Sequence, residues 1–415
     1  MHSEAKAAGD RAGVRVLAIA DTDSYLKWSA ATLDALPGSW ESTQLIIKNP
    51  VMPSAAQIRA VSSQHVEVLT NAELVRRIRL ECPDVVLLAC TGPVVAALTL
   101  QRVFWGSARP VLVTGLPGIS VPATSRAVRS RAACDLFLLH SVREVVDFAE
   151  IGAQVAPALI FGLASLPFLP AHMPGPVAGD QLGPNLVFAA QAKVPVERAH
   201  REQILLALAQ AGSAVVKLRA WSEEQQTHNE TWSYHDIMDD LIAERRVAAD
   251  AVAFVGGSMG DALRTSRGFV TVSSTAALEA MAMNRPTLII SDFGVSEEMI
   301  NLVFQESGCL GTLDDLREGR LRQPDPRWLE ANYFHPVEMN NWLEMLNQLL
   351  EKRALGQLPA RRRIVLRGRV RRRLRLMIPA ALWPHLRRAR DVVSPSRHSQ
   401  AASAPSARAA APGQE

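Results

Sequence analysis

The chain contains, near the start of its last third, the sequence Val270-Thr271-Val272-Ser273-Ser274-Thr275-Ala276-Ala277-Leu278-Glu279-Ala280-Met281. An apolar strand runs directly into three hydroxyl residues, and a helix of small residues follows, which is the strand–loop–helix unit of a parallel α/β sheet. A helix cap needs only one hydroxyl, whereas three beside the free N–H groups of a helix start favour an anion. We therefore predict that Ser273, Ser274 and Thr275 bind phosphate. Glu279, one turn further on, is predicted to accept from ribose hydroxyls.

The same unit recurs along most of the 415 residues. Nearly continuous runs of β-branched residues and Leu indicate strands buried on both faces, and therefore parallel sheets covered by helices. The expected strands are Val14–Ala20, Thr43–Lys48, His65–Leu69, Val85–Ala89, Pro110–Gly115, Leu136–His140 and Ala158–Phe161 in one series, and Asn185–Ala190, Ala214–Leu218, Val252–Val255, Phe269–Val272 and Thr287–Ser291 in a second.

A segment rich in Pro and Gly separates the two series and reads as an interdomain linker. Two Rossmann-like α/β halves place the carboxyl ends of two parallel sheets at one cleft, where ligands bind. Helices Glu297–Glu306 and Val337–Lys352 are expected to close the folded part. The expected division is residues 1–165 for the first Rossmann-like domain, 166–184 for the linker, 185–356 for the second domain, 357–392 for a basic helical segment and 393–415 for a disordered tail.

The formal net charge of +4 conceals a split. Residues 361–390 contain twelve arginines and no Asp or Glu, so outside this segment 33 basic residues face 41 acidic ones. Leu366, Val370, Leu374 and Met377 would share one helical face, and a cationic amphipathic helix favours an anionic membrane surface. A solvated arm is the alternative. Nucleic acid is not expected as a partner, because Trp383 is the segment's only aromatic residue.

Several classes are excluded by composition. No apolar run is long enough to span a bilayer, and no secretory signal precedes the first strand. Four cysteines without CxxC spacing indicate neither a disulfide framework nor a zinc site. We expect a cytoplasmic protein that the basic segment can bring to the inner face of the plasma membrane.

Two carboxylates follow the first strand, where a dinucleotide-binding protein would have its glycine fingerprint. Asp21 and Asp23 at a strand's carboxyl end suit a general base or hydroxyl recognition. The alternative is that one caps the next helix and the other is solvated.

Two loops of the first domain contain glycines that permit close backbone approach to a ligand. Their residues are Thr91 and Gly92 in one loop and Gly115, Pro117 and Gly118 in the other. Ordinary turn chemistry is the alternative.

In the second domain, the loop containing Gly256 and Gly257 reads Gly-Gly-Ser258-Met-Gly, a GxSxG pattern. A serine hydrolase would need later acid and His partners, and His335 is the one later histidine within the folded part, so close backbone approach to a ligand is favoured. A tight turn is the alternative.

Cations close another expected strand of the second domain. Lys217 and Arg219 could neutralise a leaving phosphate, and His228 or Glu230 in the next loop could act beside them. A solvated loop is the alternative. The spacing of His228 and Glu230 does not match HExxH, so no metal is expected.

These features resemble the GT-B glycosyltransferases. Lys217-Leu218-Arg219-Ala220 stands where bacterial capsule-type sialyl- and Kdo-transferases often have Lys-x-His-Pro, and Ser273-Ser274-Thr275 stands at their Ser-Ser motif. Val255 to Ser258 also looks like the Gly-Gly-Ser loop of Kdo transferases. More closely, Val16 to about Gly308 resembles an uncharacterised actinobacterial family of glycosyltransferases. The resemblance rests on Ala20-Asp21-Thr22-Asp23-Ser24-Tyr25-Leu26-Lys27-Trp28, Ala89-Cys90-Thr91-Gly92-Pro93, Gly115-Leu116-Pro117-Gly118-Ile119-Ser120-Val121-Pro122 and His140-Ser141.

The resemblance implies transfer of a sugar between the domains without a metal or other cofactor. A nucleotide-sugar donor would lie on the second domain, and an envelope polysaccharide or glycolipid acceptor on the first, with Asp23 or Asp21 as the base. Two alternatives stay open: a sugar-nucleotide 2-epimerase-like enzyme, and a non-catalytic GT-B module that only binds nucleotide.

Overall fold

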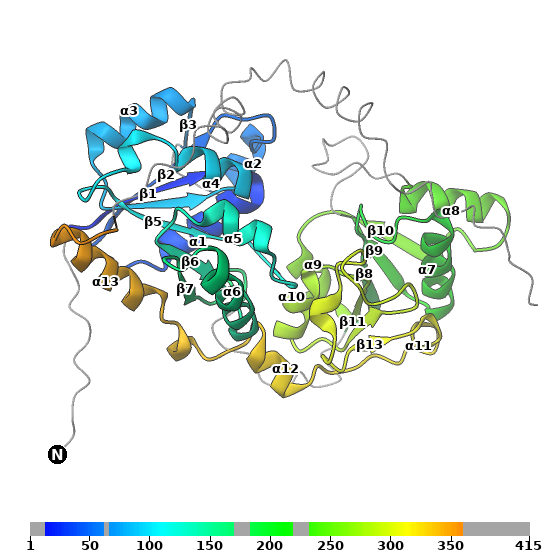
Figure 1. The fold of residues 1–415 in the computed structure, drawn as a ribbon. Coiled ribbons are helices and arrows are strands. Elements are labelled where there is room, and N and C mark those ends of the chain that lie inside the picture. The colour runs from blue at the N-terminus through cyan, green and yellow to red at the C-terminus, as the bar shows by residue number, and fades with distance from the viewer. Residues whose placement is uncertain (1–12, 62–65, 170–182, 219–231, 360–415) are drawn as a thin grey trace, which may run out of the picture.

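The first half of the chain forms a seven-stranded parallel sheet with the order β3-β2-β1-β4-β5-β6-β7 (Figure 1). The computed structural model describes residues 13–61, 66–169, 183–218 and 232–359. The strands are β1 (Arg15–Ala20), β2 (Glu41–Ile47), β3 (Glu67–Leu69), β4 (Val85–Ala89), β5 (Val111–Gly115), β6 (Leu136–Leu139) and β7 (Ile160–Leu163). The helices are α1 (Asp23–Asp34), α2 (Ala55–Val61), α3 (Asn71–Glu81), α4 (Gly92–Leu98), η1 (Arg102–Phe104), α5 (Ser125–Arg131) and α6 (Val142–Val155). We call this sheet and the helices packed on it the first lobe.

Strand β1 shows why this sheet is covered on both sides. Val16 and Ala18 belong to the core beneath α1, whereas Leu17 and Ile19 belong to the core beneath α3 to α6. Successive side chains of a strand point to opposite faces, so a strand that is apolar throughout needs helices on both. The predicted two-sided burial of the strands is confirmed.

The second half forms a six-stranded parallel sheet with the order β10-β9-β8-β11-β12-β13. The strands are β8 (Asn185–Ala189), β9 (Ala214–Lys217), β10 (Val252–Val255), β11 (Ser266–Thr271), β12 (Thr287–Ile290) and β13 (Leu310–Gly311). The helices before α13 are α7 (Arg198–Ala211), α8 (Tyr234–Ala243), α9 (Met259–Arg264), α10 (Ala276–Ala282), η3 (Leu302–Phe304), α11 (Leu313–Arg317), α12 (Pro326–Ala331) and η4 (Val337–Met339). This second lobe completes the predicted fold class of two Rossmann-like halves, which is confirmed.

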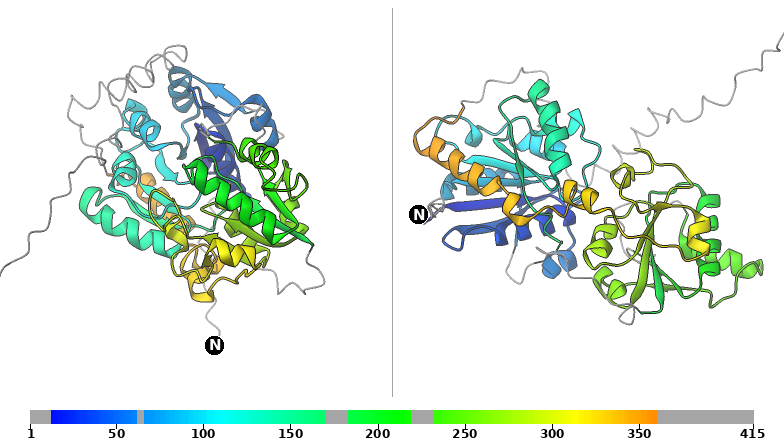
Figure 2. Two further views of the ribbon diagram at one scale, coloured as in Figure 1. Left: turned by 90° about the vertical axis from the view of Figure 1, so that its right-hand side faces the viewer. Right: turned by 90° about the horizontal axis from the view of Figure 1, so that it is seen from below.

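Helix α13 (Trp342–Ala354) returns to the first lobe (Figure 2). Trp342, Leu346 and Leu350 are buried in the same core as β5 and β6. Arg353 then donates to a carboxylate oxygen of Asp84 at 2.6 Å. The division drawn from the sequence gives this helix to the second domain, but its packing joins it to the first sheet.

The predicted helix Glu297–Glu306 is wrong. Only the short 3-10 turn η3 lies in this range, because Ile300 adopts a left-handed φ of 57°. The buried side chain of Asn301 accepts from the backbone N–H of Ser296 and donates to the carbonyl of Gly294, both at 3.0 Å. A side chain that bonds backbone groups in this way competes with a helix.

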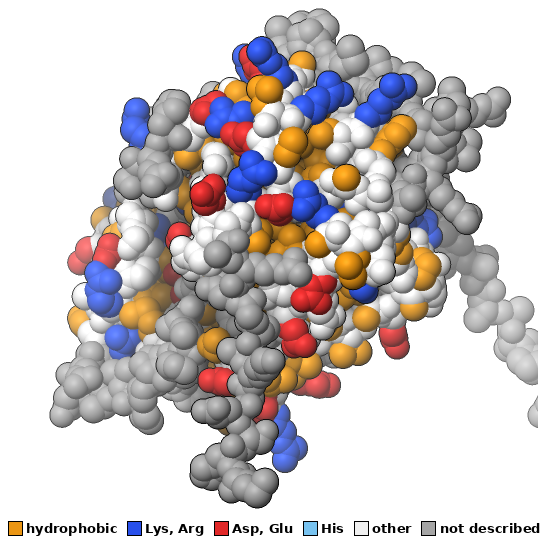
Figure 3. Space-filling model, turned by 90° about the vertical axis from the view of Figure 1, so that its left-hand side faces the viewer, with side chains coloured by type: hydrophobic (Ala, Val, Ile, Leu, Met, Phe, Trp, Pro, Cys, Tyr) orange, Lys and Arg blue, Asp and Glu red, His pale blue; other side chains and the backbone are white. Residues whose placement is uncertain are grey.

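The basic segment 361–390 lies outside the described residues. Figure 3 shows the outer face of the first lobe, where acidic and basic side chains are interspersed with apolar ones. No helix in the described ranges is both long and apolar enough to cross a membrane.

Candidate functional site

Each sheet has one point where the order of its strands reverses. In the first sheet it lies between β1 and β4, and in the second between β8 and β11. Ligands of open parallel sheets bind outside the carboxyl ends of the strands at such switch points. A ligand site is therefore expected at the loops that follow these four strands.

Asp21, directly after β1, is fully buried. Its Oδ2 atom accepts from the backbone N–H and the hydroxyl of Thr91, at 2.9 and 2.6 Å. Its Oδ1 atom is buried without a hydrogen-bond partner, and burial raises the pKa of this carboxyl. Asp21 thus ties the loop after β1 to the loop after β4.

Asp23 is the first residue of α1 and remains 24% exposed. Its Oδ2 atom pairs with the ammonium of Lys27 at 2.8 Å, and its Oδ1 atom has no partner. Of the two carboxylates predicted as bases, Asp23 is the one whose side chain remains accessible to solvent.

Two of the predicted acceptor-side glycines are explained by packing. A Cβ on Gly92 would lie 2.9 Å from the Cβ of Ser130, so this glycine lets α4 contact α5. A Cβ on Gly115 would lie 2.3 Å from the indole of Trp28, whose Nε1 donates to His140 Nε2 at 2.8 Å. These glycines admit a neighbouring side chain of the protein itself.

The loop containing Pro117 and Gly118 meets the second lobe. A Cβ on Gly118 would lie 3.9 Å from the methyl group of Thr275, and Ile119 and Val121 pack against the core that includes α10. The carboxyl edges of the two sheets therefore meet here.

Glu144 in α6 holds this loop and was not singled out in the sequence. Its Oε1 accepts from the N–H of Ser120 at 2.7 Å and from the hydroxyl of Tyr333 at 2.6 Å. Its Oε2 accepts from the N–H of His140 at 3.0 Å. Burial raises the pKa of Glu144. The Ser141-x-x-Glu144 spacing is typical of a helix cap, so the sequence carried no signal for a partner in the other lobe.

The three hydroxyl residues after β11 have different surroundings. Ser274 Oγ accepts from the N–H of Ala276 at 3.2 Å, just before α10 begins. Thr275 is exposed and lies beside Gly118. Ser273 is only 4% exposed, and its Oγ has no partner. Glu279, one turn into α10, is half-buried, and burial raises its pKa.

Lys217 at the end of β9 is buried, and its ammonium donates to the carbonyl of Leu218 at 2.7 Å. Burial lowers the pKa of this amine. Arg219, His228 and Glu230 lie outside the described residues.

Gly256 and Gly257 line a pocket of about 250 Å³ beside the β8–β9–β10 face, together with Val187 and Val215. Gly257 has a φ of 82°, which favours glycine. Ser258 caps α9, since its Oγ accepts from the N–H of Asp261 at 3.1 Å and donates to Asp261 Oδ2. The GxSxG pattern is thus a helix start whose serine is held by Asp261.

A further residue at the second switch point is Gln191. The parallel register pairs Phe188 with Val270, so Gln191 and Ser273 leave their strands at the same level. The Oε1 atom of Gln191 is buried without a partner, as is the hydroxyl of Ser273. A glutamine two residues past a strand carries no motif by which the sequence could have marked it.

Residues 16–349 match the protein family described as "Putative glycosyltransferase (DUF6716)". No curated protein sequence matches significantly. A crystal structure of a UDP-N-acetylglucosamine 2-epimerase is similar at a TM-score of 0.51 and 13% identity, covering 85% of this chain and 100% of its own. This similarity shows the fold, which is the GT-B arrangement.

Two further solved structures are more distant. The complex of S. aureus MnaA with UDP has a TM-score of 0.49 and 11% identity, covering 84% of this chain and 99% of that one. Anabaena HepE in complex with UDP and glucose has a TM-score of 0.45 and 13% identity, covering 83% and 100%.

Proposed function

The chain belongs to the family of putative glycosyltransferases that its residues 16–349 match, and we propose that it transfers a sugar from a nucleotide-sugar donor to a saccharide or glycolipid acceptor of the cell envelope. The donor binds at the second switch point and the acceptor at the first. Basic groups, hydroxyls and amide dipoles act on the donor phosphates in place of a metal ion.

The proposal rests on one observation: side-chain oxygens that are buried without a partner lie at both switch points. They are Asp21 Oδ1 and Asp23 Oδ1 in the first lobe, and Gln191 Oε1 and Ser273 Oγ in the second. A buried oxygen without a hydrogen bond costs free energy unless a ligand or water satisfies it. The contact of the Gly118 loop with Thr275 brings these edges together, as a reaction between a donor and an acceptor requires.

The roles divide between the lobes. Asp23 accepts the proton of the acceptor hydroxyl, while Asp21 holds the Thr91 loop in place; the loops with Gly92, Gly115, Pro117 and Gly118 form the acceptor side. In the second lobe Ser273, Ser274 and Thr275 contact phosphate, and Glu279 contacts ribose. Lys217, Arg219, Glu230, His228, Gly256 and Gly257 complete the proposed donor side.

The experiment measures thermal stability and sugar transfer with a panel of CMP-, UDP- and GDP-sugars. One nucleotide should raise the melting temperature, and its sugar should move to an acceptor saccharide or lipid. Conversion of the donor sugar without an acceptor would instead establish a 2-epimerase. Binding without any turnover would establish a nucleotide-binding module. If no nucleotide changes the melting temperature, the proposal fails.

The general base is tested by Asp23→Asn, which retains the size of the side chain but cannot take up a proton. Turnover should fall by about 10²- to 10⁴-fold with little change in nucleotide affinity. Asp34→Asn is the matched control, because Asp34 is exposed at the other end of α1. Full turnover of Asp23→Asn would remove Asp23 from this role.

For the basic segment 361–390 we propose binding to an anionic membrane surface. Liposome flotation with and without this segment should show loss of binding on deletion and weaker binding at high salt. Binding that is insensitive to salt would contradict the electrostatic attachment.

A further inference from the structure

Arg201 on α7 is buried to 1% exposure beneath the loop that follows β8. Its Nε donates to the carbonyl of Pro195 at 2.8 Å, and its Nη2 donates to the carbonyls of Gln191 and Ala192 at 3.2 and 2.9 Å. Its guanidinium also lies over the ring of Tyr234, 4.8 Å from the centroid. One side chain therefore sets the direction of three carbonyl groups in a loop of five residues.

The direction of the carbonyls determines the direction of the amides. In a planar trans peptide the N–H points opposite to the C=O of the same unit. Since the carbonyls of Gln191 and Ala192 point toward Arg201, the N–H groups of Ala192 and Lys193 point away from it. Neither N–H bonds to another residue in the described part of the chain. Successive amides that point the same way form a concavity that favours an anion.

The loop lies at the second switch point, beside an independent sign of a missing ligand. Ser273 leaves β11 at the same level as Gln191 leaves β8, and the hydroxyl of Thr271 still bonds the carbonyl of Ala189 at 3.1 Å just before them. Ser273 is only 4% exposed, and its Oγ has no hydrogen-bond partner. A hydroxyl in this position can donate to the same anion as the two amides.

Charge also distinguishes this loop from the strand end at Lys217. The ammonium of Lys217 is buried and engaged with a carbonyl, whereas Lys193 is exposed in the loop itself. A lysine next to an amide concavity supplies a mobile point charge for phosphate.

We propose that Arg201 is a positioning residue that shapes residues 191–195 into an anion-binding turn, and that this turn, with Lys193 and the hydroxyl of Ser273, receives the phosphate groups of the nucleotide. The inference rests on the proposed function and deepens it, because it adds the loop amides and Lys193 as phosphate contacts and Arg201 as the residue that positions the loop. Arg201 itself contacts only the protein; the amides and Lys193 contact the ligand.

The experiment measures the affinity of the full chain for inorganic pyrophosphate and for the nucleotide found in the panel, by calorimetry, alongside the melting temperature. Arg201→Met should weaken both affinities about tenfold or more, because the amides lose their fixed direction. Arg201→Lys retains the charge but cannot hold three carbonyls, so its affinity should stay reduced.

Arg285→Met is the matched control for burial. Arg285 is 6% exposed, but it lies just before β12, at the amino ends of the parallel strands and therefore away from the proposed turn. There it donates to the carbonyl of Arg264. Both Met variants should lower the melting temperature, whereas Arg285→Met should leave pyrophosphate affinity within about twofold. Lys193→Ala should weaken affinity several-fold without changing the melting temperature, and this variant carries the test if Arg201→Met does not fold.

The outcomes separate the two levels of the proposal. If the unaltered chain binds neither pyrophosphate nor any nucleotide, the proposed function fails. If it binds them, and Arg201→Lys and Lys193→Ala bind equally well, the anion-binding turn is wrong while the proposed function stands.

Discussion

The two switch points have the same topology but differ in how completely the protein satisfies them. In the first lobe, Thr91 occupies one oxygen of Asp21, and Trp28 fills the space above Gly115. Asp21 and Asp23 there each keep one oxygen unpaired, but their second oxygens are bonded to Thr91 and Lys27. At the second switch point, Ser273 Oγ and Gln191 Oε1 have no partner. Packing by the protein's own side chains makes an edge stable, whereas polar atoms that are held in place but unsatisfied make it ready for a ligand.

The largest effect is expected at His140, which the first lobe buries against Trp28. Burial lowers the pKa of His140 from 6.5 to about 4. The unfolded chain therefore takes up this proton first, so stability is complete above about pH 6.5 and declines as the pH falls toward 4. The loss relative to His140→Gln should reach about 3 kcal/mol, measured by denaturant unfolding at a series of pH values. Parallel pH curves for the two proteins would mean that His140 is not held neutral.

A second test replaces the glycine beneath Trp28. Gly115→Ala places a methyl group 2.3 Å from the indole, and overpacking of this kind should cost about 1–3 kcal/mol of unfolding free energy. Gly118→Ala is the control, because its new methyl group would lie 3.9 Å from Thr275 and should cost much less. If chemical denaturation shows the same loss of unfolding free energy for both variants, the contact with Trp28 is not the reason that a glycine stands at position 115.

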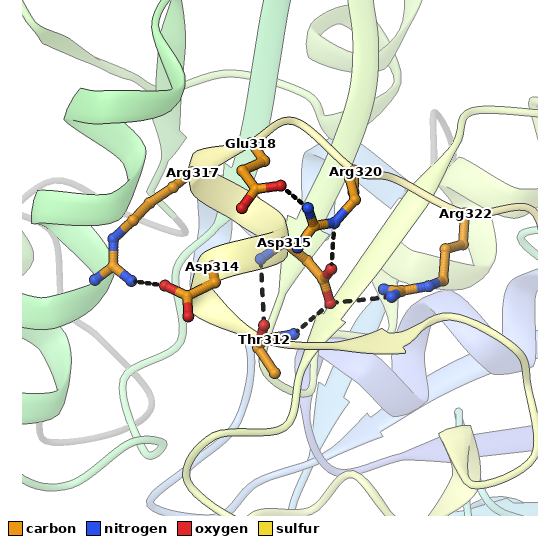
Figure 4. Close-up of polar contacts among 7 residues, drawn as sticks. All are labelled: Thr312, Asp314, Asp315, Arg317, Glu318, Arg320 and Arg322. Carbon is orange, nitrogen blue, oxygen red and sulfur yellow. Dashed lines mark hydrogen bonds and ion pairs between the residues drawn. The ribbon is translucent and has the colours of Figure 1, made fainter.

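The second lobe also has a carboxylate with both oxygens paired, that of Asp315 (Figure 4). Its carboxylate accepts from Arg320 Nε at 2.7 Å, Arg322 Nη2 at 3.0 Å and the N–H of Thr312 at 2.9 Å. These donors hold the pKa of Asp315 well below its ordinary value of 3.8. The resulting stability is complete above pH 3.8 and is lost progressively as the pH falls from there toward the lower pKa of the folded state.

Asp315→Asn should therefore lower the free energy of unfolding at neutral pH by about 2 kcal/mol and flatten its dependence on pH below about 4. Arg317→Gln is a control, since Arg317 pairs with Asp314 on the exposed side of α11. An unchanged pH dependence would contradict the role of Asp315. Nucleotide affinity should not change, because the cluster contributes only to the fold.

The smallest change in stability is expected for Ser273→Ala, and this variant tests the difference between the two switch points most directly. Ser273→Ala removes a hydroxyl that has no partner, so stability should change by less than about 0.5 kcal/mol while nucleotide affinity falls about fivefold. Ser266→Ala, at the other end of β11, removes a buried hydroxyl that donates to the carbonyl of Leu263 at 2.9 Å. Ser266→Ala should lower the stability and leave nucleotide affinity unchanged. If Ser273→Ala and Ser266→Ala change stability and nucleotide affinity equally, the unpaired hydroxyl of Ser273 has no special role in ligand binding.

The sequence was most informative where a pattern repeats. Apolar runs such as Val85–Ala89 predict buried parallel strands, because the run is shorter than an ordinary helix and apolar at every position, as a strand buried on both faces requires. It was less informative for Gly92 and Gly115, because a glycine that admits a ligand and one that admits a side chain look identical in sequence. Gln191 and Glu144 were missed because Ser273 and Tyr333, which lie near them in the fold, are far away along the chain. Arg201 was missed because its acceptors, six to ten residues away, are backbone carbonyls, which no residue type marks in the sequence.

Helix α13 also has a consequence for synthesis on the ribosome. The strands of the first lobe emerge first, but the apolar surface over β5 to β7 stays uncovered until Trp342 to Leu350 have been made. The lobe that is translated first is therefore completed last, after the entire second sheet. A chain that ends after the second sheet would leave apolar side chains of the first lobe exposed to solvent. Such an exposed apolar surface binds chaperones and promotes aggregation.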